Sequence, residues 1–283
     1  MNGEYNKFIV SRGKIIDTST PAVMAIINIT PDSFYADSRK QEEEEIVRSV
    51  RKALDDGAAI IDLGAYSTRP GADTVSPDEE MRRMRLALTA VRSAFPDTTV
   101  SIDTYRACVA EMAVSEFGAD IINDISAGTL DEAMFPTMAR LQVPYIMMHM
   151  RGTPQTMQQM TQYDDLIPDI LRFFAGRTER LRSAGFDREI IIDPGFGFAK
   201  TTEQNFELLD NLSVFQCLKA PILVGISRKT MIWKTLGITP DEALNGTTAL
   251  NCFALDRGAD ILRVHDVKEA VEAVRLFSAL HKR

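Results

Sequence analysis

The stretch IIDPGFGFAK (191–200) joins a short apolar run to a carboxylate and then to a turn that carries two aromatic rings. Asp193 ends the apolar run, and Phe196 and Phe198 follow among glycines. An acid fixed beside aromatic rings is a costly way to build an ordinary turn, because burying a charged group requires a partner. A carboxylate can accept two parallel N–H bonds from one planar group. The stretch therefore predicts a binding site for a flat group with paired donors.

Polar side chains lie near the ends of all eight apolar runs, Asp193 included: Asn28, Asp62, Asp103, Asn123, His149, Asp193, Ser227, Arg263 and His265. One Asn or Asp at such a place commonly caps the next helix, but a ring of them is harder to explain by capping. Asp62 is the weakest member, because it lies within its run, and a purely structural role stays open for it. Asp103, Asn123 and Asp193 would form one wall of acceptors, which suits the amidine-like edge of guanine-like and pterin rings.

A second group of polar residues has the opposite character. Three donors are suited to an anion: Arg69, Arg263 and His265. Asn28 could contact a phosphate oxygen or a hard cation. The stretch GISRKTMI (225–232) puts Lys229 and Thr230 where a strand gives way to a helix, and such helix starts are frequent anion sites. These residues predict a site for an anion beside the flat group.

Two polar loops follow the first and second apolar runs, NITPDSFYADSRK (28–40) and STRPGADTVS (67–76). Phe34 and Tyr35 in the first loop would be costly to leave in water unless they cover something. We therefore expect the loops to act as lids over the site. Plain surface loops with one aromatic ring packed on a helix remain the alternative.

The elements that position these residues follow an eightfold pattern. Short β-branched runs recur, each followed by a helical stretch, at 23–29, 59–65, 99–103, 120–125, 144–150, 189–194, 221–227 and 260–266. Strands that are apolar throughout are buried on both faces, as in parallel sheets covered by helices. Eight such units predict an α/β fold, a single (β/α)8 TIM barrel spanning 1–283 as one domain. An open doubly wound sheet is the rival, but no Gly-rich dinucleotide fingerprint is present.

Local signals mark the ends of several elements. The segment KFIVSRGKIID (7–17) is expected to form a hairpin over the barrel bottom. Ser76 followed by Pro77 predicts the start of a helix. Gly57, Gly118 and Gly258, each just before a strand, are predicted to end helices with a left-handed backbone conformation. The four glutamates 42–45 are expected to form the first turn of a helix, where negative charge suits the helix dipole.

Composition excludes several classes of partner. The 283 residues carry a net charge of −8, which argues against nucleic acid or an anionic membrane as the main partner. No apolar run approaches about 18 residues and the start of the chain is polar, so we expect neither a membrane span nor a signal peptide. Cys108, Cys217 and Cys252 form no CxxC pair and are expected to be buried thiols in a reducing cytoplasm.

Eight motifs, each at a strand end, occur in order: NITPDSF, STRPGA, SIDT, INDI, HM.G (149–152), DPGFGF, SRK and RVHDV. With these motifs the chain closely resembles the dihydropteroate synthase family over essentially its whole length. The resemblance implies the condensation of 6-hydroxymethyl-7,8-dihydropterin diphosphate with para-aminobenzoate, which gives dihydropteroate and diphosphate for folate synthesis. It also implies a cytoplasmic transferase that uses Mg²⁺, forms a homodimer and is a target of sulfonamides.

The resemblance also implies roles for individual residues. The pterin would be held by Asp103, Asn123, Asp193 and Lys229. The diphosphate would be held by Asn28, Arg69, Arg263 and His265, with Mg²⁺ bridging its oxygens and Asn28. The para-aminobenzoate pocket would be shaped by Phe34, Pro70, Phe198 and Thr230. The lids would include Thr30, Asp32, Ser33, Asp37, Ser67 and Thr68. Catalysis would rest on Asp103, Asp193, Lys229, Arg263 and His265.

The sequence departs from the family pattern at two places. Gly64-Ala65-Tyr66 stands where the family often has Gly-Gly-Glu, and Ser38-Arg39 stands where it commonly has glycines. These changes concern loop conformation and drug response, and neither removes a chemical group named above.

No Ser–His–Asp or Cys–His arrangement is evident, so we expect a loose substitution in which diphosphate leaves a cationic pterin methyl group. Two other functions stay open. A methyltetrahydrofolate-dependent methyltransferase would share the pterin residues but would have no use for the diphosphate donors. A pterin-binding subunit without catalytic activity would bind ligand and show no turnover.

Overall fold

The computed structural model describes residues 7–29, 36–66 and 75–281, and for 36–40 it describes the backbone alone. These residues form an eight-stranded parallel sheet in the order β8-β7-β6-β5-β4-β3-β10-β9. Its strands are β3 (Ala22–Asn28), β4 (Ile60–Gly64), β5 (Val100–Asp103), β6 (Ile121–Asp124), β7 (Tyr145–Met148), β8 (Ile190–Asp193), β9 (Leu223–Val224) and β10 (Ile261–Val264). A parallel bridge between Ile192 and Ile222 joins the two edges, which closes the predicted α/β barrel.

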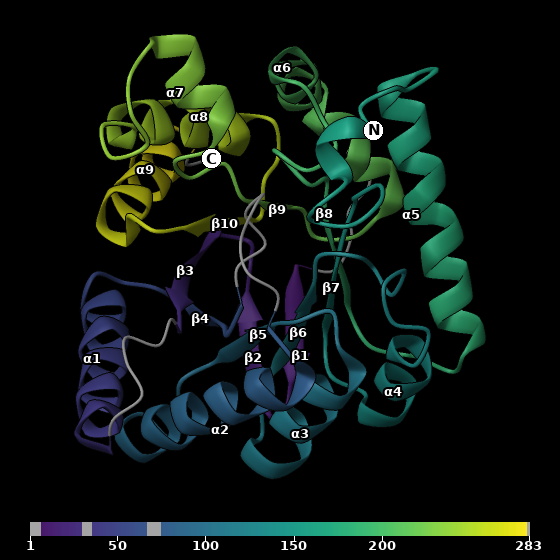
Figure 1. Cartoon of the computed structure of the whole chain (residues 1–283). Helices are drawn as coiled ribbons and strands as arrows, with labels where there is room; N and C mark the ends of the chain where they lie inside the picture. Colours follow the sequence, from purple (N-terminus) through teal and green to yellow (C-terminus); the bar gives the residue numbers. More distant parts are fainter. Residues whose placement is uncertain (1–6, 30–35, 67–74, 282–283) are drawn as a thin grey trace.

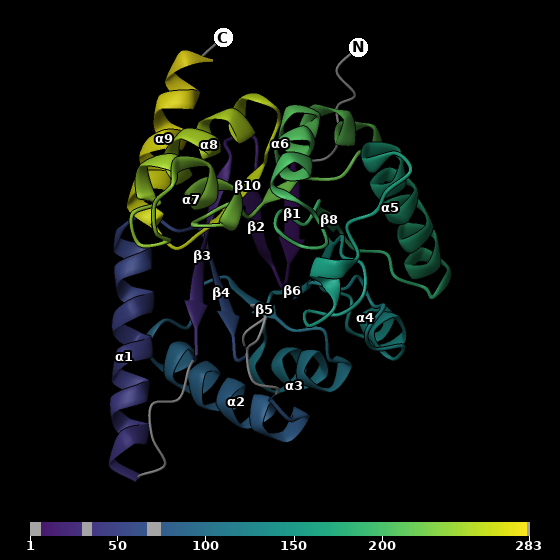
Figure 2. The same ribbon diagram turned by 45° about the horizontal axis from the view of Figure 1, so that its top comes forward.

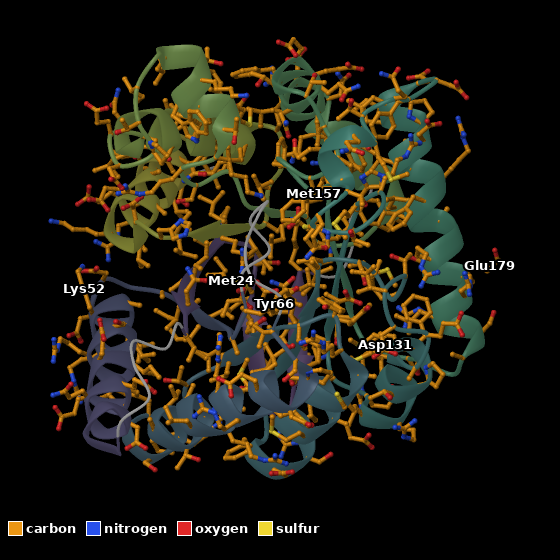
Figure 3. The ribbon with its side chains drawn as sticks, in the orientation of Figure 1. Met24, Lys52, Tyr66, Asp131, Met157 and Glu179 are labelled. Atoms are coloured by element: carbon orange, nitrogen blue, oxygen red, sulfur yellow. The ribbon has the colours of Figure 1, made fainter. Side chains whose placement is uncertain are left out.

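Helices surround the strands, as Figures 1 and 2 show. The described residues contain α1 (Ala36–Asp55), α2 (Pro77–Ala94), α3 (Ala107–Phe117), α4 (Met134–Leu141), α5 (Leu166–Ser183), α6 (Thr202–Asp210), α7 (Thr230–Leu236), α8 (Leu244–Asp256) and α9 (Val267–Leu280), with the 3-10 segments η1 (Met157–Gln159) and η2 (Leu212–Leu218). Lys52 on α1 and Glu179 on α5 lie at the outer margins, whereas Met24 and Tyr66 lie in the middle of the molecule (Figure 3). The helices thus bury their inner faces against the barrel.

The predicted hairpin over the barrel bottom is confirmed. Strands β1 (Phe8–Ser11) and β2 (Lys14–Asp17) pair antiparallel. Ile9 and Ile16 are buried in one apolar layer with residues near the amino ends of seven barrel strands, Ala22, Met24, Ile60, Ile121, Ile146, Ile191, Leu223 and Ile261. At the rim, Lys14 Nζ lies 3.1 Å from a carboxylate oxygen of Asp120, just before β6. The hairpin therefore closes the end of the barrel opposite to the strand carboxyl ends.

The inner face of the barrel changes from apolar to polar along four of the strands, β4, β6, β8 and β10. Successive side chains of a strand point to opposite faces, so residues two apart share a face. Two positions after the apolar layer residues Ile60, Ile121, Ile191 and Ile261 come the polar residues Asp62, Asn123, Asp193 and Arg263. One polar layer therefore lies directly above the apolar layer, toward the carboxyl ends where barrel enzymes carry their sites.

The helix-end signals are confirmed. Ser76 precedes α2, and its hydroxyl oxygen accepts a hydrogen bond of 3.3 Å from the backbone N–H of Glu79. Gly57, Gly118 and Gly258 have φ values of 101°, 64° and 94°, the left-handed region that glycine adopts without steric cost.

Three expectations were wrong in detail. Helix α1 begins at Ala36, so the glutamates 42–45 lie beyond its first turn, because the polar residues before them continue the helix. Strand β9 comprises Leu223–Val224 alone and not the whole run 221–227. Before it, Pro221 has no N–H and the N–H of Ile222 donates to the side chain of Asp260; after it, the chain turns, with Lys229 N–H donating to the backbone oxygen of Ile226. The three cysteines, expected to be buried, are exposed free thiols on α3, η2 and α8.

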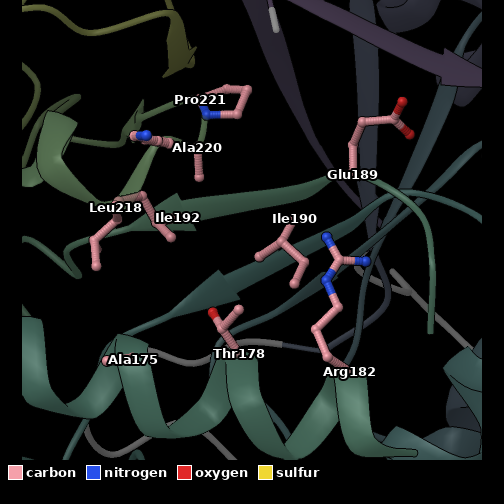
Figure 4. Close-up of a pocket in the computed structure, with 10 residues that line it drawn as sticks. Ala175, Thr178, Arg182, Glu189, Ile190, Ile192, Leu218, Ala220 and Pro221 are labelled. Carbon is pink, nitrogen blue, oxygen red and sulfur yellow. The ribbon is translucent and has the colours of Figure 1, made fainter. Parts of the chain in front are cut away.

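One pocket, of about 290 Å³, lies on the flank of the barrel between α5 and the amino ends of β8 and β9 (Figure 4). Arg182, Glu189 and Lys219 are its charged lining residues. Arg182 is occupied there, since it donates to the backbone oxygens of Phe186 and Arg188 at 3.0 and 2.8 Å. This pocket lies at the end of the barrel away from the polar layer.

Among the described residues, no helix is both long and apolar enough to cross a bilayer.

Candidate active site

Arg263 joins the polar groups of the barrel mouth. Its Nε lies 2.6 Å from Oδ2 of Asp62, and its Nη2 lies 2.6 Å from Oδ2 of Asp103. Asn123 Nδ2 donates to the same Asp62 oxygen at 3.1 Å. We call these four residues, from β4, β5, β6 and β10, the carboxylate cluster. The structure thus brings Asp103, Asn123 and Arg263 together, and it adds Asp62, for which the sequence had left a structural role open.

Two carboxylate oxygens of this cluster have no hydrogen-bond partner among the described residues: Oδ1 of Asp62 and Oδ1 of Asp103. Both residues are buried. Burial raises the pKa of Asp103 to about 7, with Arg263 opposing this rise and Asp62 adding to it. A buried acceptor without a partner costs free energy, so these oxygens are suited to a ligand that brings N–H donors.

Asp193 ends β8 beside the aromatic turn predicted from the sequence. Its Oδ1 accepts the backbone N–H of Gly195 at 2.8 Å, which fixes the carboxylate at the start of the turn. Burial raises the pKa of Asp193, and the charge of Lys229 opposes the rise. Asp193 therefore lies at the same mouth as the carboxylate cluster, close enough for the charge of Arg263 to lower its pKa, although β7 separates β8 from β6.

Lys229 lies across the turn from Asp193. Its Nζ donates to the backbone oxygen of Phe196 and lies 4.7 Å from the centroid of the Phe198 ring. Burial lowers the pKa of Lys229 to about 8, and Asp193 opposes this fall. Lys229 thus lies near Asp193, the other predicted pterin-binding residue beside this turn, and its cation lies over the aromatic face of Phe198.

The expected anion-binding residues lie at the rim. His265, at the end of β10, is exposed, and its Nδ1 lies 3.0 Å from the hydroxyl of Ser227. Thr230, the first residue of α7, and Asn28, the last residue of β3, are also exposed. Arg228 turns away from this group, since it forms a two-bonded ion pair with Asp266 at 2.8 and 2.9 Å.

Other predicted residues cannot be placed. Those outside the described residues are Phe34, Arg69, Pro70, Thr30, Asp32, Ser33, Ser67 and Thr68. Asp37, Ser38 and Arg39 lie in the first turns of α1, where the backbone alone is described. Tyr66 packs edge to face on Tyr105, with ring centroids 5.3 Å apart. The Ser38-Arg39 departure therefore falls within helix α1, and Tyr66 of the other departure packs on an aromatic ring.

The described residues contain no group of three or more His, Cys, Asp or Glu that could hold a metal ion. Asn28 offers one amide oxygen at the mouth. Mg²⁺ commonly takes one or two protein oxygens together with substrate phosphates and water. Asn28 fits such a shared ligand set, and it does not fit a protein-only metal site.

Three buried side chains of the site were missed as functional residues. The alternation of side chains along a strand could have placed Asp62 on the inner face of the barrel, because it lies two residues after Ile60 of the apolar layer. His149 and Lys200 are both buried at the turn, with 3.0 Å between Nδ1 and Nζ. His149 begins the motif HM.G (149–152), but no pattern in the sequence indicates a partner for His149 or for Lys200.

Comparisons with known proteins agree with this geometry. The family model described as "Pterin binding enzyme" matches residues 24–265. The chain is 40% identical to a dihydropteroate synthase of Escherichia coli over 96% of the chain and 95% of that protein. It is 44% identical to one of Synechocystis over 91% of the chain and 89% of that protein.

Solved structures are similar over nearly the whole chain. A Yersinia pestis dihydropteroate synthase in complex with a sulfonamide drug has a TM-score of 0.88 and 38% identity, covering 96% of this chain and 98% of that one. A Xanthomonas albilineans dihydropteroate synthase with 4-aminobenzoic acid has a TM-score of 0.87 and 34% identity, covering 98% and 99%.

The barrel, with acceptors and cations gathered at its carboxyl ends, is thus that of a pterin-binding enzyme. Within this class, the chain is about 40% identical to dihydropteroate synthases over nearly their full length. The chain belongs to the dihydropteroate synthase family, whose members are transferases of folate synthesis.

Proposed function

We propose that this chain condenses 6-hydroxymethyl-7,8-dihydropterin diphosphate with para-aminobenzoate, giving dihydropteroate and diphosphate. The observation that carries the proposal is the carboxylate cluster, in which Arg263 lies 2.6 Å from oxygens of both Asp62 and Asp103. The remaining oxygen of each carboxylate has no partner among the described residues. A pterin ring presents paired N–H donors along one edge, which would satisfy acceptors of this kind.

In this proposal, the pterin is held from two sides. The carboxylates of Asp103 and Asp193 accept hydrogen bonds from the pterin edge, and the amide of Asn123 can accept or donate there. Lys229 donates to an acceptor of the ring and keeps the Phe198 face beside it. Asp62 holds Arg263 and Asn123 in position. The carboxylates of Asp103 and Asp193 stand fixed before the substrate binds, so their negative charge would stabilise a cationic pterin methyl group without reorganising.

The diphosphate leaves toward the rim, where Arg263, His265 and Asn28 contact its oxygens. A guanidinium carries five N–H donors. The bonds to Asp62 and Asp103 use Nε and Nη2, so donors of Arg263 remain for the leaving anion. Arg69 is proposed to join them, and it lies outside the described residues.

Mg²⁺ is proposed as the metal cofactor, with Asn28 as its protein ligand. When bound, the ion would neutralise charge on the diphosphate as it leaves. The exposed amide of Asn28 at the end of β3 supports a metal that arrives with the diphosphate.

The second substrate is proposed to bind next to the turn, between Phe198 and Thr230, with Phe34 and Pro70 covering it. The lid residues Thr30, Asp32, Ser33, Asp37, Ser67 and Thr68 would exclude water, which would otherwise capture the cationic pterin. Sulfonamides are proposed to compete for this place, since the Yersinia pestis relative is described in complex with such a drug.

A homodimer is proposed through the face of α7, α8 and α9, which lie together in Figures 1 and 2. Large apolar side chains are exposed on these helices: Leu236, Phe253, Leu276 and Leu280 at 54, 56, 73 and 80%. Exposed apolar side chains gathered on one face are typical of protein contacts. We also propose a cytoplasmic location and one domain over 1–283, which free thiols and the single barrel support.

The test is diphosphate release by purified protein supplied with dihydropterin diphosphate and para-aminobenzoate, with and without Mg²⁺. We expect turnover that depends on both substrates and falls after chelation. A methyltetrahydrofolate-dependent methyltransferase would release no diphosphate, and a subunit without activity would bind pterin by calorimetry without turnover. Either result would refute the proposed function.

A further inference from the structure

Lys200 is a buried lysine that the proposed reaction does not use. It follows the aromatic turn, and its residue is 3% exposed. Its Nζ makes three contacts, to the backbone oxygen of Gly195 at 2.9 Å, to that of Phe198 at 3.1 Å and to Nδ1 of His149 at 3.0 Å. A lysine ammonium has three N–H donors and no acceptor, so each donor finds one partner.

His149 follows β7 and is 2% exposed. Burial lowers the pKa of Lys200 to about 7, and the charge of Asp193 opposes this fall. While Lys200 is protonated it cannot accept, so Nδ1 of His149 accepts and Nε2 carries the proton. The ring packs edge to face on Phe173, with centroids 4.9 Å apart. Burial lowers the pKa of His149 well below its ordinary value, and the charge of Lys200 lowers it further, so the ring stays a neutral acceptor.

The turn held by Lys200 carries the groups that contact Asp193 and Lys229. Gly195 N donates to Asp193 at 2.8 Å, and the Phe196 oxygen accepts from Lys229. Lys200 Nζ donates to the backbone oxygen of Phe198, and the centroid of the Phe198 ring lies 4.7 Å from Lys229 Nζ. Lys200 therefore holds the turn that contacts both Asp193 and Lys229, although Lys200 itself does not reach the barrel mouth.

The contact between the turn and β7 is close. A Cβ at Gly195 would lie 2.0 Å from the backbone oxygen of His149, and Gly195 has φ of 75°. The turn has a second anchor, because Asn205 Oδ1 accepts the N–H of Gly197 at 2.6 Å. Loss of Lys200 would thus loosen the Gly195 and Phe198 ends of the turn while Asn205 still holds its middle.

We propose that Lys200 and His149 form a positioning pair, which ties the turn 195–198 to the end of β7 and so holds Asp193 and Lys229 at the spacing that binds the pterin. The inference rests on the proposed function for the identity of the ligand. A displacement of about 1 Å at a reacting group can cost about 100-fold in rate, so a loosened turn is expected to be visible in kinetics.

The test compares Lys200→Met, His149→Leu and His149→Asn with wild type. Leucine removes the acceptor, whereas asparagine can place its side-chain oxygen where Nδ1 stands. We expect Lys200→Met and His149→Leu to weaken binding of 6-hydroxymethylpterin by 10- to 100-fold in calorimetry and to lower kcat, and His149→Asn to restore most of both. The double variant Lys200→Met/His149→Leu is expected to lose no more than either single variant, because the two side chains act as one unit.

Lys14→Met is the matched control. Lys14 Nζ also contacts a backbone oxygen, that of Thr98 at 3.0 Å, and an acidic residue, Asp120, but at the barrel bottom. We expect it to lower the unfolding midpoint while pterin affinity and kcat stay within twofold of wild type. Should Lys200→Met fail to fold, the two His149 variants carry the comparison. Wild-type pterin affinity and kcat in Lys200→Met or His149→Leu, or additive losses in the double variant, would overturn the pair. A wild type that binds pterin but releases no diphosphate would refute the proposed reaction instead.

Discussion

Arg263 Nε lies 2.6 Å from Asp62 Oδ2, although the two residues are 201 positions apart in the chain. The pair links β10 to β4 across the barrel interior, and Asp103 contacts the other side of the same guanidinium. One cation is thus shared by two buried carboxylates. Stability and substrate binding therefore depend on the same side chain.

Replacing Arg263 is expected to reduce stability as well as activity. Arg263→Ala leaves Asp62 and Asp103 without their shared cation, and breaking a buried pair costs about 3–5 kcal/mol of unfolding free energy. Chemical denaturation measures this loss. Arg140→Ala is the control, because its pair with Glu111 is exposed on both sides and contributes little. A loss no larger than that of Arg140→Ala would contradict the shared-cation arrangement.

The stability loss in Arg263→Ala is expected to depend on pH. The pKa of Asp103, already raised from 3.8 to about 7, rises further when Arg263 is removed. Between the unfolded and folded pKa values the folded chain holds a proton that the unfolded chain releases, so stability falls as pH rises. Denaturation should therefore show a larger deficit at about pH 8 than at about pH 5.5. An equal deficit at both pH values would contradict the raised pKa.

A second pH effect is expected in catalysis. Lys229, with a pKa of about 8, is protonated below that pH and neutral above it. Asp193, Arg263 and Asp103 are the charged groups that act on it. If the ammonium form binds the pterin, kcat/KM for dihydropterin diphosphate falls about tenfold per pH unit above about pH 8, since kcat/KM reports the free enzyme. Lys229→Arg, which stays protonated, should remove this alkaline limb even where its maximum is lower. An unchanged limb would assign the titration to another group.

Much of the fold could be predicted because its signals are local. Runs buried on both faces, Ser76 before Pro77 and the glycines at helix ends each act within a few residues. The site was harder, because its contacts depend on register between distant strands. Arg263 was expected among the diphosphate ligands from its residue type, but no local pattern shows that Asp62 and Asp103 already accept two of its donors. The partners of Lys200 depend likewise on how the turn folds back onto β7.

The bottom hairpin is expected to stabilise the barrel without affecting the chemistry. Ile9 is fully buried in the apolar layer, so Ile9→Ala should cost about 2–5 kcal/mol of unfolding free energy through lost burial and a cavity. Its kcat/KM should stay within about twofold, because the polar layer lies above. Ile15, 68% exposed on the same hairpin, is the control, and Ile15→Ala should change neither quantity. A large fall in kcat/KM for Ile9→Ala at full folding would show coupling between the two ends.

The close approach of the turn to β7 can be separated from backbone strain by two glycine variants. Gly195 and Gly185 both have positive φ, 75° and 95°, so alanine is strained at either place. At Gly185 a Cβ would meet nothing within 4 Å, whereas at Gly195 it would lie 2.0 Å from the backbone oxygen of His149. Gly185→Ala should therefore lose about 1–3 kcal/mol of unfolding free energy with normal kcat, as expected for strain alone. Gly195→Ala should lose more stability and reduce kcat at least about 100-fold, because the whole turn must move away from β7 and carry Phe196 and Phe198 with it. Equal behaviour of the two variants in denaturation and steady-state kinetics would mean that the contact with His149 does not set the position of the turn.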